Sequence, residues 1–210
     1  MVNDNDLRLE RLELGSWETN AYIVTCLKTG DSVLIDAPAE ADTIIKSLEG
    51  TEVKRILITH SHFDHTGALP ELRSRLKVPV AAHAADASGL PYPPEILLND
   101  GDVIPLGKLN IEVIHTPGHT RGGLCFRVGK YLMSGDTIFP GGPGNTGSPT
   151  AFKQILKSIR DKILVLPDDT QIYPGHGSPT TLKKERGEFA AFSSRSHDSN
   201  LCGDVLWLSS

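Results

Sequence analysis

The stretch "THSHFDHTG" at residues 59–67 places three histidines and an aspartate within six positions, directly behind an apolar, strand-like run. In the pattern H-x-H-x-D-H, His60 and His62 can project from the same side of an extended turn, whereas Asp64 and His65 are adjacent and must diverge. Two side chains that diverge in this way are most simply explained by two neighbouring metal positions. Imidazole and carboxylate groups suit Zn²⁺, and also Fe or Mn. The stretch therefore predicts a buried strand that ends in a metal-binding loop.

One loop supplies too few ligands for two ions, so further ligands are expected at the ends of other strands. Three positions qualify, because each follows an apolar strand beside glycine or proline: His119 in "TPGHT", Asp136 in "MSGDT" and His176 in "YPGHG". Glycine lets the backbone turn sharply and approach closely there. Taken singly, each position is more simply a tight turn. Taken with the histidine-rich loop, the three favour a metal site at the rim of a sheet.

Length and charge limit the class of protein. The chain has 210 residues, of which 39% are hydrophobic, which suits one domain or two halves that share a core. The net charge is −5 without a basic block, so nucleic acid is a poor candidate partner. No window approaches the roughly 18–20 apolar residues of a membrane helix, and the N-terminus lacks an apolar signal core. We therefore expect a cytoplasmic protein that does not bind membranes, with Cys26 and Cys125 as buried, reduced thiols.

The first half of the chain is rich in strands. Residues 7–14 alternate at Leu7 and Leu9 and then shift to Leu12 and Leu14, which suggests a strand with a bulge or a turn. Further elements are expected in the order strand 20–27, strand 32–37, helix 41–50, strand 53–60, helix 66–76 and strand 77–83. Residues 88–101 contain three prolines and are expected to form a loop over the surface.

The second half repeats this theme. Hairpins are expected over 102–116 and 123–136, an amphipathic helix over 150–164, a strand over 170–177 and a last helix over 180–192. Strand-rich blocks followed by helices occur twice, which fits a pair of β-sheets covered by helices on the outside.

These motifs together resemble the metallo-β-lactamase fold superfamily, and within it the glyoxalase II-like hydrolases, over residues 15–190. The resemblance implies an αββα sandwich, two mixed β-sheets flanked by helices, as a single domain with a core of about residues 7–192 and a tail of 193–210. It also implies that one metal is held by His60, His62 and His119, that the other is held by Asp64, His65 and His176, and that Asp136 bridges them.

The activity that follows is that of a binuclear metal-dependent hydrolase resembling hydroxyacylglutathione hydrolase. Two Zn²⁺ ions, with Fe or Mn as alternatives in either position, would share a hydroxide that attacks the carbonyl of a small thioester or ester. Asp64 could relay a proton besides acting as a ligand. No Ser-His-Asp or Cys-His arrangement is evident, and none is needed.

The substrate is less constrained than the metal site. The loop "PGGPGNTG" at 140–147 follows the bridging aspartate and should line the mouth of the site, with Phe139 and Asn145 as candidate substrate contacts. Glutathione-using glyoxalase II enzymes typically carry a basic residue where Asn145 stands and often add a C-terminal helical domain. Only residues 177–210 follow the last ligand. Both departures argue against the usual recognition of glutathione, but not against thioester or ester hydrolysis.

Several rival functions share this ligand set. A mono-iron persulfide dioxygenase is the main alternative, and a lactonase is another, although lactonases usually place a tyrosine where this chain has Phe139. A β-lactamase would normally be exported and use a less histidine-rich second site, and nucleic-acid-cleaving relatives carry a large insertion. A metal-binding scaffold would need only four closed ligands, so the larger set argues for an enzyme.

Other polar and apolar residues receive weaker interpretations. Asp36 is either a hydrogen-bond partner of a ligand histidine or a turn residue. His83 and His115 are expected to orient neighbours or sit in the core, and His197 to be solvated. The tail "NLCGDVLWLSS" should dock on the body of the protein or on a second subunit, which leaves a homodimer open.

Overall fold

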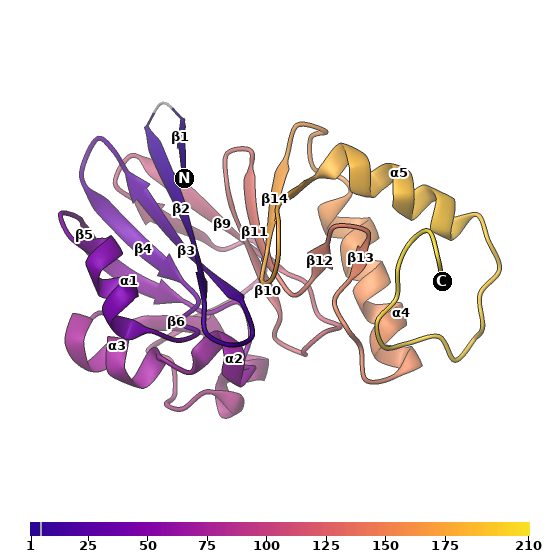
Figure 1. Ribbon diagram of the computed structural model, residues 1–210, viewed down its shortest axis with the longest axis horizontal. Helices are drawn as coiled ribbons and strands as arrows, with labels where there is room; N and C mark the ends of the chain where they lie inside the picture. Colours follow the sequence, from indigo (N-terminus) through magenta and orange to yellow (C-terminus); the bar gives the residue numbers. More distant parts are fainter. Residues whose placement is uncertain (5) are drawn as a thin grey trace.

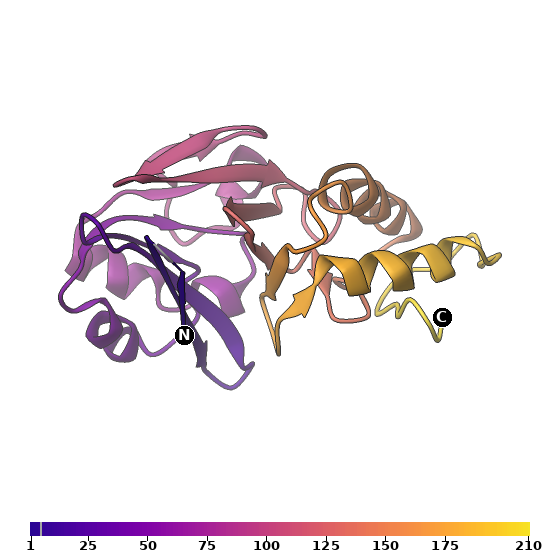
Figure 2. The ribbon, with the colours of Figure 1, turned by 90° about the horizontal axis from the view of Figure 1, so that it is seen from above.

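Two β-sheets pack against each other in the computed structural model, which describes residues 1–4 and 6–210 (Figure 1). The first sheet has seven strands and the second has six. Helices lie on the outer side of each sheet, so that the molecule has the four layers of an αββα sandwich when it is seen from above (Figure 2). The prediction of two mixed sheets flanked by helices is confirmed.

Strands of the first sheet lie side by side in chain order. They are β1 (Val2–Asp4), β2 (Leu7–Leu14), β3 (Thr19–Cys26), β4 (Asp31–Ile35), β5 (Glu52–Leu57), β6 (Val80–His83) and β7 (Ile96–Leu98). Pairing is antiparallel from β1 to β4 and parallel from β4 to β7. The switch has a simple cause: a parallel neighbour requires a crossover connection. The helix α1 (Ala41–Leu48) provides it between β4 and β5, α2 (Phe63–Thr66) and α3 (Leu69–Leu76) between β5 and β6, and residues 84–95 between β6 and β7.

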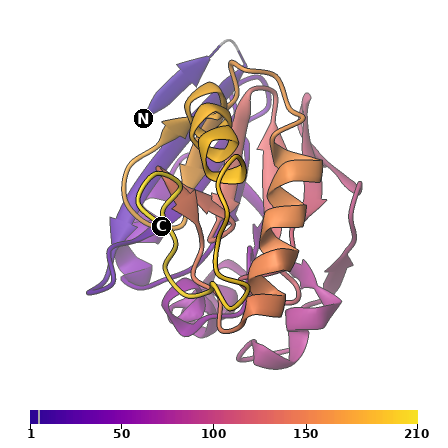
Figure 3. The ribbon, with the colours of Figure 1, turned by 90° about the vertical axis from the view of Figure 1, so that its right-hand side faces the viewer.

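The second sheet has the spatial order β15-β14-β11-β10-β9-β8. Its strands are β8 (Val103–Leu106), β9 (Leu109–His115), β10 (Leu124–Val128), β11 (Tyr131–Gly135), β14 (Gln171–Pro174) and β15 (Thr180–Thr181). Only β11 and β14 pair in parallel, because α4 (Pro149–Ser158) and the π-helical turn η2 (Ile159–Ile163) cross over between them. The helix α5 (Leu182–Ser193) lies beside α4 on the outer face (Figure 3).

Three apolar clusters hold the layers together. The central one fills the space between the sheets, with Tyr22, Phe126 and Met133 among its buried members. A second packs α1 and α3 on the first sheet, for example through Ile44 and Leu72. The third joins α4, α5 and the tail to the second sheet. The central strands of both sheets, such as β3 and β11, are thus buried on both faces, which explains their near-continuous apolar runs.

The prediction of a bulge in residues 7–14 is wrong. β2 pairs with β3 in one unbroken register from Leu7 to Leu14. Leu7 and Leu9 belong to the central cluster, whereas Leu14 belongs to the cluster under the helices. Apolar residues can change face without a change of register because both faces of this sheet are covered.

The expectation of an irregular loop over 88–101 is wrong at its end. A short helical segment η1 (Ala84–Gly89) precedes the prolines, and β7 then adds an edge strand parallel to β6. An edge position needs only one side of the strand to be paired, so three apolar residues after the prolines are sufficient. A further ribbon, β12 (Ile138–Phe139) and β13 (Gly142–Pro143), forms inside the loop that follows Asp136.

Within residues 1–4 and 6–210, no helix combines the length and the apolar character that crossing a membrane would require.

Candidate metal centre

The histidine-rich loop leaves the carboxyl end of β5 and runs into α2. His60 and His62 precede the helix, and Asp64 and His65 lie within its single turn. Consecutive residues of a helix point about 100° apart, because 3.6 residues make one turn. Asp64 and His65 therefore diverge, as the sequence pattern predicts.

The remaining ligand candidates come from the second sheet. His119 lies in the connection from β9 to β10, Asp136 follows β11 and His176 follows β14. Because β11 and β14 are parallel neighbours, their carboxyl ends meet at one edge. Gly175 makes the close approach possible, since a Cβ atom there would clash with the Asp136 carboxylate and the His65 ring.

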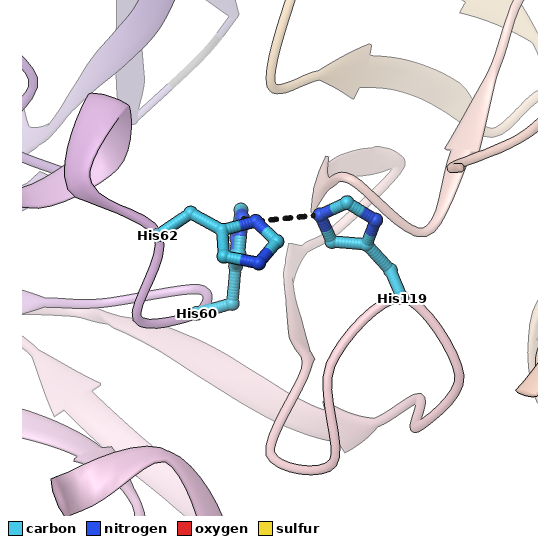
Figure 4. A group of neighbouring side chains, drawn as sticks. All are labelled: His60, His62 and His119. Atoms are coloured by element: carbon cyan, nitrogen blue, oxygen red, sulfur yellow. Dashed lines mark hydrogen bonds between the residues drawn. The ribbon is translucent and has the colours of Figure 1, made fainter. Parts of the chain in front are cut away.

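Three histidines form the first group of ligand atoms (Figure 4). The Nδ1 atom of His62 lies 3.1 Å from Nε2 of His60 and 2.9 Å from Nε2 of His119. Bonds of about 2.0–2.1 Å to a tetrahedral ion place ligand atoms about 3.3 Å apart. The three nitrogens therefore have nearly the spacing of one tetrahedral face.

Asp64, His65 and His176 form the second group. Nε2 of His176 lies 3.1 Å from Oδ2 of Asp64 and 3.3 Å from Nε2 of His65. Nε2 of His65 lies 3.6 Å from the same Asp64 oxygen. These distances again fit the edges of a small coordination polyhedron.

Asp136 lies between the two groups. Its Oδ2 atom is 3.4 Å from Nε2 of His119, and its Oδ1 atom is 3.4 Å from Nε2 of His65. The buried Oδ1 has no hydrogen-bond partner among the described residues. A buried carboxylate oxygen without a donor is costly, and a cation would remove that cost. The donor set and this unpaired oxygen fit two divalent ions that share Asp136.

Hydrogen bonds behind the ligands fix how the imidazole rings face the centre. Nδ1 of His65 donates to the Asp36 carboxylate at 2.8 Å. Nδ1 of His119 donates to the backbone carbonyl of Asn145 at 2.8 Å, and Nδ1 of His176 to the backbone carbonyl of Trp17 at 3.0 Å. With Nδ1 protonated, Nε2 of each ring presents a lone pair to the centre. Sequence analysis left the role of Asp36 open, and the structure places it behind a ligand.

The charge state of the centre follows from burial and from its carboxylates. Burial lowers the pKa of His60 well below its usual range. Burial also opposes the charging of His65, but the carboxylates of Asp36 and Asp136 outweigh it and raise its pKa to about 10. Burial acts to raise the pKa of Asp136, and the close approach and positive charge of His65 override it and hold that pKa well below the usual range. The metal-free centre thus keeps a proton on His65, which a bound ion would have to displace.

One supporting residue was missed by sequence analysis. Asp86 is buried, and its two oxygens accept the backbone N–H groups of Ser61 at 3.1 Å and Gly122 at 2.7 Å. It therefore ties the loop that carries His60 and His62 to the loop that carries His119. Backbone amides leave no residue signature, so the pattern of side chains contained no signal for this role.

An open cavity of about 290 Å³ lies beside the centre and exposes His119 and Asp136. Both predicted substrate contacts line it. The ring of Phe139 is stacked 6.4 Å from that of His176, and the side chain of Asn145 donates to Asp204 of the tail at 2.9 Å. Residues 88–101 do not line this cavity. The loop over 140–147 therefore lies at the site, as expected, and the C-terminal tail lies there too.

Three other histidines lie outside the two ligand groups. His83 and His115 stack on each other, with ring centroids 4.0 Å apart. The expectation that His197 is solvated is wrong: it is half-buried, stacks 3.9 Å from the Phe192 ring and donates to the Phe192 carbonyl.

Known proteins share both the sequence pattern and the fold. A family profile described as the metallo-beta-lactamase superfamily matches residues 14–176. The hydroxyacylglutathione hydrolase GloC of Haemophilus influenzae is 33% identical over 179 residues, which cover 74% of this chain and 84% of that protein. Among solved structures, the BLEG-1 B3 metallo-beta-lactamase is 30% identical with a TM-score of 0.78, and the match covers 86% of this chain and 97% of that chain. TTHA1623, solved in a di-iron-bound form, is 33% identical with a TM-score of 0.71, and the match covers 84% of this chain and 96% of that chain.

Proposed function

The chain belongs to the metallo-β-lactamase superfamily, and on that premise we propose that it is a binuclear metal-dependent hydrolase that cleaves a thioester or an ester. One observation carries the proposal: two ligand groups meet at the Asp136 carboxylate, which has one unpaired oxygen, beside an open cavity. The relative GloC, a hydroxyacylglutathione hydrolase by name, supports the glyoxalase II-like character of the reaction.

We assign His60, His62 and His119 to one ion and Asp64, His65 and His176 to the other, with Asp136 between them. Two bound divalent ions supply Lewis acidity, which lowers the pKa of a water molecule and polarises a carbonyl oxygen. Zn²⁺ is the proposed ion, and the nitrogen and oxygen donors also suit iron or manganese.

The protein's own residues hold this arrangement and admit the substrate. Asp36, Asn145 and Trp17 aim ligand nitrogens inward through the hydrogen bonds behind them. Asp64 suits ligation better than proton relay: although burial acts to raise its pKa, the hydrogen bond with His176 lowers it, and a weakly basic carboxylate remains charged. Phe139 forms an apolar part of the cavity wall beside His176.

Metal analysis combined with a substrate panel tests the proposal. The panel contains S-lactoylglutathione, a second thioester, an ester, a lactone, a β-lactam and a persulfide with oxygen monitoring. We expect two metal ions per chain and thioester or ester hydrolysis. A single iron with oxygen uptake would instead identify a persulfide dioxygenase and overturn the proposal.

The variant His62→Ala tests the assignment of ligands. It removes a nitrogen that lies within 3.1 Å of two others, so one ion and nearly all turnover should be lost. His83→Ala is a matched control, since His83 lies outside both ligand groups. Near-normal metal content and turnover in His62→Ala would refute the assignment.

A further inference from the structure

The C-terminal tail is built into the wall of the cavity. After α5 the chain turns back, and Gly203 forms an antiparallel bridge with Thr146 through backbone hydrogen bonds of 2.8 and 3.3 Å. The backbone N–H of Trp207 donates to the Gly141 carbonyl at 2.7 Å. Figure 3 shows this segment curling back beside α4 and α5. The tail therefore pairs with both ends of the loop that follows the bridging aspartate.

A buried anchor fixes the tail in this position. The side chain of Trp207 is fully buried, and its ring packs edge-on against Phe189 and Phe192 of α5 at 5.3 Å each. Val205 is also buried, and Arg195 donates to the Trp207 carbonyl. Asp204, Val205 and Leu206 all contribute to the lining of the cavity, and Asp204 and Leu206 are exposed.

The tail brings a negative charge to the site. Apart from His119 and Asp136 of the metal centre, Asp204 is the one ionisable side chain among the residues that line the cavity. Asn145 holds one of its oxygens, and no ion pair to Asp204 occurs within the described part of the chain. Phe139, Pro143 and Leu206 make the rest of the lining largely apolar. A group placed here meets an apolar surface and an uncompensated carboxylate.

We infer that the tail determines the charge class of the substrate, so that the group occupying this cavity is uncharged or cationic and an anionic group is disfavoured. The inference rests on the proposed function, because it concerns the substrate of the same metal centre. A carboxylate on the substrate would be repelled by Asp204, and no lysine or arginine lines this cavity to offset that repulsion. An ammonium group would gain from the same charge.

A neighbouring cavity supplies an internal comparison. It has a volume of about 390 Å³, shares His119 with the first cavity and is also lined by Arg121. A substrate that reaches from the metal centre into both cavities would therefore carry any anionic group on the Arg121 side and its uncharged or cationic group beneath the tail.

The test varies the charge on each half of a thioester separately. One series keeps an acetyl group and changes the thiol among cysteamine, N-acetylcysteamine and 3-mercaptopropionate; the other keeps N-acetylcysteamine and changes the acyl group among acetyl, succinyl and β-alanyl. Asp204→Asn is compared with Asp169→Asn, which removes the same charge from an exposed turn before β14. For the half that lies beneath the tail, Asp204→Asn should raise kcat/KM of the anionic member and lower that of the cationic member, each by about fivefold, as expected for a partly exposed charge pair. The uncharged member should change little, and high salt should reduce the discrimination.

Equilibrium binding separates failure of this inference from failure of the proposed function. The three product thiols and the primary amides of the three acyl groups are titrated calorimetrically into the metal-loaded wild type and both variants. A preference for cationic over anionic ligands that Asp204→Asn removes supports the inference, even if the wild type hydrolyses none of the thioesters, in which case the proposed function alone fails. Charge preferences in turnover and binding that are equal in Asp204→Asn and Asp169→Asn overturn the inference. A loss of anionic binding in Arg121→Gln, with no response to Asp204→Asn, overturns it as well.

Discussion

Asp36 belongs to neither ligand group, yet it fixes the position of several ligand candidates. Its backbone is left-handed, with φ of 61°, and its side chain is buried. One oxygen accepts the backbone N–H of Thr59 at 2.8 Å, and the other accepts the Thr59 hydroxyl at 2.7 Å and Nδ1 of His65 at 2.8 Å. A single carboxylate thus holds both the start and the end of the metal-binding loop.

The variant Asp36→Asn tests this role. Asparagine tolerates the left-handed backbone. Its NH₂ group, however, would face one of the groups that now donate a hydrogen bond to the carboxylate, so that two donors would meet. Metal affinity should fall roughly 10- to 100-fold, as for other partners of ligand histidines. Competition with a chromophoric chelator measures the affinity, and Asp169→Asn serves as the control. Unchanged affinity in Asp36→Asn would show that the three hydrogen bonds do not support the ligands.

The pH dependence of the metal-free protein should report His65. Its folded-state pKa of about 10 lies above the ordinary value of 6.5, so the proton stabilises the fold. That stabilisation is complete below pH 6.5 and is lost as the pH rises through about 10. Urea unfolding of the metal-free protein at pH 6.5, 8 and 9.5 measures the loss. His65→Gln should show a flatter profile over this range, and an identical profile in both proteins would contradict the prediction.

Metal-ligand candidates could be found from sequence because side-chain type and strand-end position both marked them. The structure brings all seven together, with Asp136 between two groups. The residues that support the ligands could be predicted from the sequence only in part. Asp36 was a candidate because it ends an apolar strand, whereas Asp86 and the Trp17 carbonyl act through backbone groups, which every residue possesses.

At the scale of elements, the tail is held mainly by one side chain. Trp207→Ala would leave a cavity among Phe189 and Phe192, with an expected loss of about 3–5 kcal/mol in the free energy of unfolding. The same variant should raise KM while the metal content stays constant, because the tail walls the cavity and contributes no metal ligand.

Trp207→Phe provides the matched control for that prediction. The indole N–H of Trp207 has no hydrogen-bond partner among the described residues, so phenylalanine would keep most of the packing and remove an unpaired polar group. Its stability and KM should stay near those of the wild type. Chemical unfolding and steady-state kinetics measure both variants, and equal behaviour of the two would contradict an anchoring role for the large side chain.

Sequence periodicity identified most helices and strands, and its errors have physical causes. The shift between Leu9 and Leu12 looked like a bulge, because alternation assumes that only one face of a strand is buried. The strand β7 was missed because three residues are too few for a periodic signal. The docking site of the tail depends on pairing between Thr146 and Gly203, which are 57 positions apart, and local patterns do not report such contacts.

At the scale of the whole molecule, the centre joins the two sheets. His60, His62, Asp64 and His65 follow β5 of the first sheet, whereas His119, Asp136 and His176 follow strands of the second. Each ligand group draws members from both sides. An ion held by either group would therefore connect the two halves of the molecule.

Chelation should measure this connection. An ion whose free concentration is 1,000 times its dissociation constant stabilises the fold by about 4 kcal/mol. Its removal corresponds to a fall in Tm of roughly 8–16 °C for a chain of this size. Differential scanning calorimetry with and without EDTA provides the comparison. EDTA that is already saturated with zinc is the control for effects of the chelator itself, and an equal Tm in all three samples would exclude a structural contribution of the metal.

The layered architecture was accessible from sequence, but the sheet order was not. Repeated blocks of strands and helices indicate two covered sheets, and the resemblance to a known fold supplied their arrangement. The parallel pairing of β11 with β14 spans the whole of α4 and η2 and brings Asp136 next to His176. Residue spacing alone contains no information on that contact.

The three hydrogen bonds of Asp36 have one more consequence, which concerns metal exchange. Because they join Thr59 and His65 through protein groups alone, they would fix the loop that carries four of the ligand candidates whichever divalent ion binds there. Nitrogen and oxygen donors can hold several first-row metals, and which one is bound in the cell depends on metal availability more than on raw affinity. The occupant of the centre is then set by metal supply during biosynthesis, and protein produced in zinc-rich, iron-rich or manganese-rich medium should carry the metal that was abundant.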